Sequence, residues 1–274
     1  MDAPTALQMD ALTDIGLHRR NNEDAWWIGQ VGGEGRSMEP GPAPLRAALG
    51  RGCTPALLLV CDGMGGASAG EVASQMAVAH VVRELARTAA RLRTSAGAQG
   101  AILSALKRAN EAIGARAAEP GCEGMGTTLS LLCFTGGGEA FWGQAGDSRI
   151  YVCRGGRLRQ ISRDHSPVGR LRQSGRISEA DARRHPRRNQ IDQHLGAPPG
   201  EFEPDIGAEA IRPGDVYLVC SDGLSDGLWD REIEEMLGAM RSPEHVRPAA
   251  QGLIARAKAA SGRDNLTAAV ALVI

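Results

Sequence analysis

This sequence has few aromatic residues and almost no excess of positive or negative charge. Phe, Trp and Tyr make up 3% of the 274 residues, and the formal net charge is -1. A nearly neutral chain has no general attraction to nucleic acid or to an anionic membrane, so we expect neither as a partner. No apolar run approaches the ~20 residues that span a bilayer. Residues 1–10 also lack the basic and apolar regions of a secretory signal, so we expect a cytoplasmic protein.

The six cysteines include no Cys-x-x-Cys pair, which excludes zinc-ribbon and thioredoxin-like sites. Several lie inside apolar runs, as in 57–61 and 216–220. We expect reduced, buried thiols that pack as small hydrophobic groups, in agreement with a reducing compartment. The length suits one large domain or two small ones.

Apolar periodicity predicts many strands and two blocks of helices. Turn residues separate most of the strands, which favours an α+β domain with mainly antiparallel sheets. One long helix is expected to bury Val72, Met76, Ala79, Val82 and Leu85. The next is expected to bury Ile102, Ala105, Leu106, Ala109 and Ile113. In the strand at 24–31, Trp26 and Trp27 are expected to point to opposite faces. We expect strands at 11–16, 24–31, 56–61, 127–134, 139–145, 149–153, 158–161, 216–220 and 265–274, and helices at 71–93, 98–118, 232–240 and 243–260.

Two segments differ from this pattern. Residues 32–55 are rich in Gly and Pro and are expected to form a long surface loop or a loose hairpin. The role of this segment is either partner docking or surface decoration, and we favour decoration. Residues 164–199 are polar and rich in Arg, with short helices expected at 168–174 and 178–185. We interpret this second segment as a flap over a site.

Aspartates recur where apolar strands begin or end. A single Asp-Gly after a strand is usually only a turn. Several such aspartates at the ends of buried strands would lie close together and repel one another unless a cation neutralised them. Oxygen-only ligands favour Mg²⁺ or Mn²⁺ over zinc, and two such ions roughly 3.5–4 Å apart can activate a water. The aspartates are Asp24, Asp62, Asp147, Asp222 and Asp264.

The spacing suggests how these ligands are shared. Asp62 is the natural bridging ligand, and Gly63 has no Cβ, so its carbonyl can approach an ion. Asp222 and Asp264 would complete one ion, and Asp24 would hold the other.

The ordered set of motifs resembles the bacterial type-2C (metal-dependent) serine/threonine protein phosphatases over nearly the whole chain. The resemblance implies a four-layer αββα sandwich with a binuclear metal site at one end, formed by a single catalytic domain of residues 1–274 with a flap at about 164–199. The motifs are Thr13-Asp14-x-Gly16-x-x-Arg19-x-x-Asn22-Glu23-Asp24, Val60-Cys61-Asp62-Gly63-Met64-Gly65-Gly66, Gly70-Glu71, Gly126-Thr127-Thr128, Gly146-Asp147-Ser148-Arg149, Asp164-His165-Ser166, Ser221-Asp222-Gly223-Leu224 and Asp264-Asn265-Leu266-Thr267.

The resemblance also implies residue roles. Arg19 resembles the clamp on the substrate phosphate, in agreement with the fit of a guanidinium to two phosphate oxygens. Asp147 and Asp226 resemble ligands of a weaker third ion. One helical turn would bring Asp226 to the same side as Asp222. The implied cofactors are two Mn²⁺ or Mg²⁺ ions per chain. Glu23 and Asn265 are expected to position the ligands, and Glu23 is also expected to share the role of Asp24 at the second ion.

Three positions depart from the family pattern or invite another role. Met64 stands where eukaryotic members carry a His that acts as general acid, so the proton donor is either a water at a third ion near Asp147 and Asp226 or the solvent. His165 is expected to be structural rather than a substitute acid. Within residues 189–196 of the flap, only Asn189 at the start and Leu195-Gly196 at the end match the family pattern. The sequence therefore does not indicate which substrates the flap selects.

The resemblance implies hydrolysis of phosphoserine and phosphothreonine in proteins by a metal-activated water. We expect a monomer whose partners are phosphorylated proteins, including a bacterial serine/threonine kinase. A non-catalytic binding domain of the same fold would be expected to lack Asp62, Asp222 or Asp264, and all three are present. A phosphatase specialised for one small phosphorylated protein would use the same chemistry, so the sequence hardly distinguishes it. The match along the full chain favours the broader serine/threonine class. Phosphatase chemistry through a cysteine or histidine nucleophile is not expected.

Overall fold

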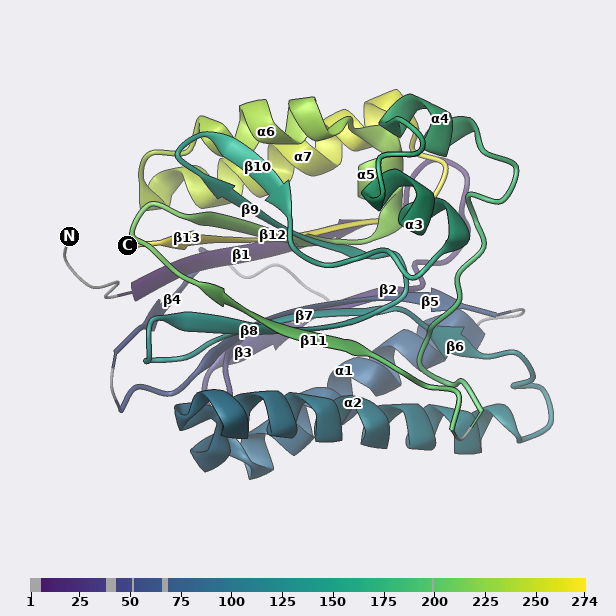
Figure 1. The fold of residues 1–274 in the computed structure, drawn as a ribbon, viewed down its shortest axis with the longest axis horizontal. Helices are drawn as coiled ribbons and strands as arrows, with labels where there is room; N and C mark the ends of the chain where they lie inside the picture. Colours follow the sequence, from purple (N-terminus) through teal and green to yellow (C-terminus); the bar gives the residue numbers. More distant parts are fainter. Residues whose placement is uncertain (1–5, 38–42, 51, 66–68, 199) are drawn as a thin grey trace.

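Two β-sheets lie face to face in the computed structural model, and helices cover the outer face of each sheet (Figure 1). The structure describes residues 6–37, 43–50, 52–65, 69–198 and 200–274. The order of layers is helix, sheet, sheet, helix, which confirms the predicted α+β sandwich. Within these ranges, no helix is long and apolar enough to cross a bilayer.

Antiparallel pairing joins the described strands of both sheets. The first sheet has the order β10-β9-β12-β13-β1-β4, and the second has the order β11-β8-β7-β5-β2-β3 with β6 paired to β5. The strands are β1 (Ala6–Asp14), β2 (Asp24–Gln30), β3 (Gly35–Ser37), β4 (Leu45–Ala48), β5 (Ala56–Met64), β6 (Gly126–Thr127), β7 (Leu129–Phe134), β8 (Glu139–Ala145), β9 (Arg149–Arg154), β10 (Arg157–Gln160), β11 (Asp205–Ala210), β12 (Val216–Cys220) and β13 (Leu266–Val273).

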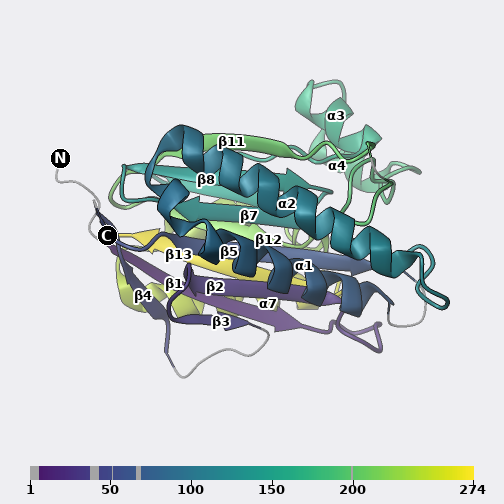
Figure 2. The ribbon, with the colours of Figure 1, turned by 90° about the horizontal axis from the view of Figure 1, so that it is seen from below.

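The helices form an outer layer on each sheet. Two long helices cross the second sheet (Figure 2), and two others cover the first. They are α1 (Ala69–Arg87) and α2 (Ser95–Ala117) on the second sheet, and α6 (Asp230–Gly238) and α7 (Val246–Ala260) on the first; the shorter helices are α3 (Pro167–Gln173), α4 (Glu179–Arg184), α5 (Asp222–Gly227) and the 3₁₀ turns Ala89–Arg93 and Pro243–His245.

Strand β5 has both faces buried, which explains its continuous apolar run. Leu59 packs with the helices α1 and α2, while Leu58 faces the first sheet. Successive side chains of a strand point to opposite faces, so every residue of a doubly covered strand must be apolar. The adjacent strand β2 shows the predicted split: Trp26 is buried between the sheets, and Trp27 lies against the helical layer.

The predicted buried face of α1 was only partly correct. Leu85 is buried and Met76 and Val82 pack against the core, but Val72 is 40% exposed. The helix centres its buried face on Ala73, Ala77 and Val81. Small side chains let a helix backbone approach a sheet closely, and this contact outweighs the larger apolar residues one position away. The predicted face of the second helix was correct.

The prediction of a long surface loop or a loose hairpin over 32–55 was correct for the hairpin, but it missed the strand β4. Strand β3 pairs with β2 as a hairpin, and β4 joins the edge of the other sheet beside β1. Leu45 and Ala47 of β4 are buried between the sheets, so the segment is more than decoration. Residues 38–42 and 51 lie outside the described residues.

Strand β11 was not predicted. It is an edge strand paired only with β8, and its residues are half-buried or exposed. An edge strand with one neighbour needs little apolar surface, so its sequence gives a weak periodic signal.

Candidate metal centre

Four of the predicted aspartates are brought to one end of the space between the sheets. Asp24 and Asp62 are direct cross-strand neighbours on β2 and β5. Alternation places Asp62 on the same face as Leu58, which points to the first sheet. From the first sheet, Asp222 begins α5 just after β12, and Asp264 lies just before β13. The inter-sheet core is therefore closed at this end by carboxylates.

A cavity of about 500 Å³ lies at this end. Both carboxylates of the α5 turn, Asp222 and Asp226, line it, as the helical spacing predicted. Asp24 is not among the lining residues, whereas its neighbour Glu23 is. The residues predicted for the site that line the cavity are Arg19, Glu23, Asp62, Gly63, Met64, Asp147, Asp222, Asp226 and Asp264.

The carboxylates raise one another's pKa. Burial, followed by the charges of Asp24 and Asp222, raises the pKa of Asp62 well above its usual range. Burial and the charges of Asp226 and Asp264 raise the pKa of Asp222 to about 6. Burial, and then the charge of Asp222, raises the pKa of Asp147 well above its usual value. This is the effect of like charges that share a site of low dielectric constant.

The donor set fits a hard divalent cation. The Oδ1 atoms of Asp24 and Asp222 are buried, and no donor among the described residues reaches them. Unpaired buried carboxylate oxygens in a group of like charges are the ligands that Mg²⁺ or Mn²⁺ prefers. No three His, Cys, Asp or Glu side chains within the described ranges already enclose a metal position.

Asp24 and Glu23 have different surroundings. Asp24 is buried, and its Oδ2 accepts hydrogen bonds from Ser221 Oγ (2.7 Å) and Thr267 Oγ1 (2.6 Å). Burial raises its pKa to about 7 although these two bonds favour the charged form. Asp24 therefore ties the two sheets together, and Glu23 is the member of the pair that reaches the cavity.

Asn265 holds the loop that carries Glu23. Its Oδ1 accepts a hydrogen bond from the backbone N–H of Glu23 at 2.7 Å. Its Nδ2 donates to the carbonyls of Ile15 and Asn21, both at 3.0 Å. The Asn265 side chain thus forms hydrogen bonds with three backbone groups of the β1–β2 loop, which supports the prediction that it positions the ligands of the site.

Arg19 lies at the rim of the cavity and is 47% exposed. Its Nη2 donates to Asp264 Oδ2 at 2.6 Å. This hydrogen bond, followed by the charges of Asp264, Glu23 and Asp62, raises the pKa of the guanidinium, against the opposing effect of its burial. An exposed cation beside a carboxylate cluster is placed to contact an incoming anion.

Gly63 is required by packing as well as by the site. A Cβ there would lie 2.0 Å from the carbonyl oxygen of Gly70 in the first turn of α1 and 2.7 Å from that of Glu23. The sequence suggested that the missing side chain opens the carbonyl to an ion. The structure adds that it lets α1 approach β5.

Two threonines hold the backbone of Asp62, a role that the sequence did not indicate. Thr128 Oγ1 accepts from the Asp62 N–H at 3.0 Å, and Thr127 Oγ1 donates to the Asp62 carbonyl at 2.9 Å. Thr128 also shares a 2.7 Å hydrogen bond with Ser148, beside Asp147. The sequence signal available for this role is the Gly126-Thr127-Thr128 motif, because two adjacent hydroxyls can form hydrogen bonds with the backbone of a neighbouring strand.

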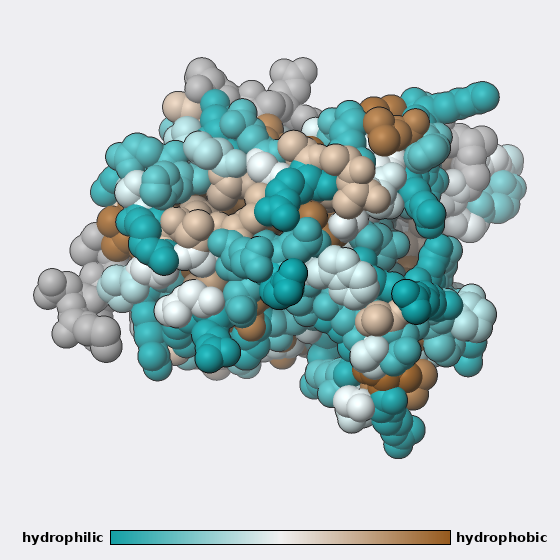
Figure 3. All heavy atoms as spheres, turned by 90° about the horizontal axis from the view of Figure 1, so that it is seen from above, coloured by the Kyte–Doolittle hydropathy of each residue, from teal (hydrophilic) through white to brown (hydrophobic). Residues whose placement is uncertain are grey.

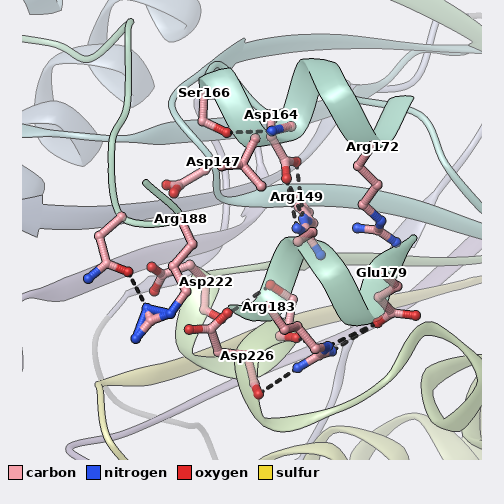
Figure 4. A pocket seen from close by; sticks show the side chains of 15 residues that line it. Asp147, Arg149, Asp164, Ser166, Arg172, Glu179, Arg183, Arg188, Asp222 and Asp226 are labelled. Atoms are coloured by element: carbon pink, nitrogen blue, oxygen red, sulfur yellow. Dashed lines mark hydrogen bonds and ion pairs between the residues drawn. The ribbon is translucent and has the colours of Figure 1, made fainter. Parts of the chain in front are cut away.

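Arginines of the flap face the other side of the aspartates (Figure 4). Arg188 lies beside Asp147 and Asp222 and lines the cavity. Arg183 donates to the carbonyls of Ser225, Asp226 and Leu228 at the end of α5, at 2.7, 2.7 and 2.5 Å. These arginines were not predicted as site residues, because their positions depend on how the flap folds back.

His165 does not line the cavity. Its Nε2 lies 3.4 Å from Asp205 Oδ2, and its backbone bonds with Gly146 and Asp192 at the base of the flap. These contacts support the predicted structural role. A Cys-x5-Arg spacing, the pattern of cysteine-based phosphatases, does occur once, from Cys153 to Arg159. It lies on the β9–β10 hairpin, where burial raises the pKa of the Cys153 thiol, so it gives no reactive thiolate.

Comparisons with known proteins agree with this geometry. The model of the family described as protein phosphatase 2C matches residues 48–270. The serine/threonine protein phosphatase PstP of Mycobacterium tuberculosis is 38% identical over 273 residues, which are 98% of this chain and 45% of PstP. This chain therefore spans less than half the length of that relative.

Solved structures show the same fold. A serine/threonine phosphatase of S. agalactiae superposes with a TM-score of 0.80 at 29% identity, covering 98% of this chain and 100% of the other. The catalytic domain of PstP in complex with two manganese ions superposes with a TM-score of 0.73 at 35% identity, covering 98% of this chain and 99% of the other. From the family model and these similarities, this chain is a member of the protein phosphatase 2C family.

Proposed function

We propose that the chain hydrolyses phosphoserine and phosphothreonine in proteins with the aid of divalent cations. The observation that carries the proposal is the cavity lined by Asp62, Asp222 and Asp264, with Arg19 at its rim. The family and the manganese-bound structure of PstP's catalytic domain support the same activity.

The proposed ligands follow from the side chains that reach the cavity. Asp62, Asp222 and Asp264 would hold one Mn²⁺ or Mg²⁺, and Asp62 with the Gly63 carbonyl would hold a second. Bound cations of this kind lower the pKa of water and polarise a phosphoryl group. A weaker third ion would use Asp147 and Asp226 together with Asp222.

Glu23 and Asp24 divide the remaining work. Glu23 lines the cavity, where it would contact the second ion. Asp24 would act on the same ion, partly through water, while its Oδ2 is held by the hydroxyls of Ser221 and Thr267. Asn265 fixes the backbone of Glu23.

Arg19 binds the substrate phosphate. Its guanidinium donates to Asp264, and a substrate phosphate competes with this carboxylate for the same fork of donors. A cation held by Asp264 would compete with Arg19 for this carboxylate and would leave the guanidinium available to the phosphate.

Met64 lines the cavity and cannot donate a proton. We propose that the departing alcohol is protonated from the side of Asp147 and Asp226, which is the polar side of the cavity facing the flap. Solvent is the alternative donor.

We further propose that residues 1–274 form one catalytic domain, with residues 164–199 as its flap. We propose that the protein acts as a cytoplasmic monomer. Its partners would be phosphorylated proteins, including a serine/threonine kinase whose action it opposes, and not nucleic acid or membrane.

A phosphopeptide assay tests the proposal. The purified chain should release phosphate from a phosphothreonine peptide with Mn²⁺ and not with a chelator, and Asp62→Ala and Asp222→Ala should abolish turnover. Arg19→Ala should raise KM and leave manganese affinity, measured by calorimetry, nearly unchanged. Activity in the chelator, or activity that survives Asp62→Ala, would refute the proposed chemistry.

A further inference from the structure

The flap carries more positive charge than the rest of the chain. Residues 164–199 contain seven Arg against four Asp and Glu, although the whole chain has a net charge of -1. Two of these arginines, Arg172 and Arg183, bind the α5–α6 region through Asp230 and the α5 carbonyls. The others are free of that structural work.

Three of the remaining arginines surround one hollow on the flap. The hollow has a volume of about 470 Å³ and an apolar floor. In the surface view, the flap is largely hydrophilic with a hydrophobic patch among its polar atoms (Figure 3, lower right). We call this feature the arginine hollow; it is lined by Pro167, Arg170, Leu171, Ser174, Arg176 and Arg187.

The backbone that presents these arginines is well defined. Gly175 lies just after helix α3 and has φ 70°. The N–H of the next residue, Arg176, donates to the Leu171 carbonyl of the helix at 3.0 Å. This is a helix-ending arrangement that only glycine adopts easily, and it fixes the position of the next residue. Arg187 donates through Nε to Gln190 Oε1 at 2.7 Å, which orients the guanidinium and leaves its Nη groups to bind a ligand.

The positive charge of the hollow is only partly neutralised within the described structure. Arg170 pairs with Asp192, and both side chains are exposed. Neither Arg176 nor Arg187 makes an ion pair within the described residues. Guanidinium groups that converge without enough carboxylates suit a phosphate dianion, which accepts several bidentate hydrogen bonds at once.

The arginine hollow is next to the carboxylate cavity. Arg187 lines the hollow, and the next two residues, Arg188 and Asn189, line the cavity. One short stretch of backbone therefore separates the two. An extended peptide advances about 3.3 Å per residue, so a second phosphate several residues along the same peptide would reach the hollow.

We propose that the arginine hollow binds a second phosphate group of the same substrate, so that the enzyme prefers protein segments phosphorylated at two nearby positions. The preference rests on the phosphatase activity proposed above. The first phosphate occupies the cavity beside Arg19, and the second lowers KM through Arg170, Arg176 and Arg187.

Peptide kinetics test this preference. The peptides carry one phosphothreonine and, about five residues away on either side, alanine, glutamate or a non-hydrolysable phosphonate. With the wild-type chain and Mn²⁺, the phosphonate should raise kcat/KM about tenfold over alanine on one side, mainly through KM. The double substitution Arg176→Ala with Arg187→Ala should remove this gain and leave p-nitrophenyl phosphate turnover unchanged.

Arg184→Ala is the matched control, because Arg184 is an exposed arginine on the same flap that does not line the hollow. It should keep the gain. Equal kcat/KM for the alanine and phosphonate peptides, an equal gain with glutamate, or an equal loss in Arg184→Ala would overturn the inference. Absence of turnover on every phosphopeptide and on p-nitrophenyl phosphate would instead refute the proposed function itself.

Discussion

Replacing Arg183 by methionine should release the flap from α5. The Arg183 side chain donates three hydrogen bonds to carbonyls at the end of α5 and pairs with Glu179 at 2.9 Å. Its guanidinium also lies 4.3 Å from the ring centre of Trp229. Methionine keeps the length of the stem but removes all of these interactions.

The expected loss follows from the number and kind of contacts. A hydrogen bond from a charged donor contributes about 1.5 kcal/mol or more, and the cation–π contact at a half-exposed ring about 0.5–1 kcal/mol. The contacts are not additive because they share one group, so we expect a loss of about 3 kcal/mol. If the flap unfolds with the domain, Tm should fall by roughly 6–12 °C.

Two measurements distinguish local from global effects. Hydrogen exchange of residues 179–184 should accelerate by about a hundredfold if the flap detaches alone, and calorimetry reports the global loss. Arg184→Met is the control on the same helix: its side chain makes no hydrogen bond within the described structure, so neither quantity should change. Unchanged exchange together with unchanged Tm in Arg183→Met would show that the latch between flap and α5 does not exist.

Three further outcomes follow from the site. Mn²⁺ at a hundred times its dissociation constant should raise the free energy of unfolding by about 2.7 kcal/mol, and this gain, followed by thermal melts, should vanish in Asp222→Ala. Asn265→Ala should lower stability by about 2 kcal/mol in urea titrations and weaken manganese binding, because it removes the hydrogen bonds from Asn265 to the Ile15 and Asn21 carbonyls and from the Glu23 N–H; unchanged manganese affinity would contradict its positioning role. Asp226→Ala should slow hydrolysis of a phosphoserine peptide far more than that of p-nitrophenyl phosphate, whose leaving group needs no acid; equal losses in kcat would count against proton donation from that side.

Much of the fold follows from local patterns in the sequence. The apolar run of β5 and the spacing of Ile102, Leu106 and Ile113 predicted a buried strand and the buried face of α2, because covered strands and helices each impose their own period. The ordered Asp-Gly turns predicted an oxygen-rich cluster at the strand ends. These signals depend only on neighbours in the chain.

Tertiary packing decided between arrangements that local sequence patterns favour equally. The approach of Gly70 to Gly63 selected the small-residue face of α1 and left Val72 exposed. Leu45 and Ala47 became part of the core because β1 offered an open sheet edge.

The same distinction applies to the site. That aspartates would gather was determined by the sequence, since each follows or precedes a buried strand. Which of the neighbours Glu23 and Asp24 faces the cavity was decided by the other sheet, whose hydroxyls at Ser221 and Thr267 hold Asp24 away from it. The flap arginines were placed in the same way, because carbonyls exposed at the end of α5 are acceptors that only the assembled fold presents to Arg183.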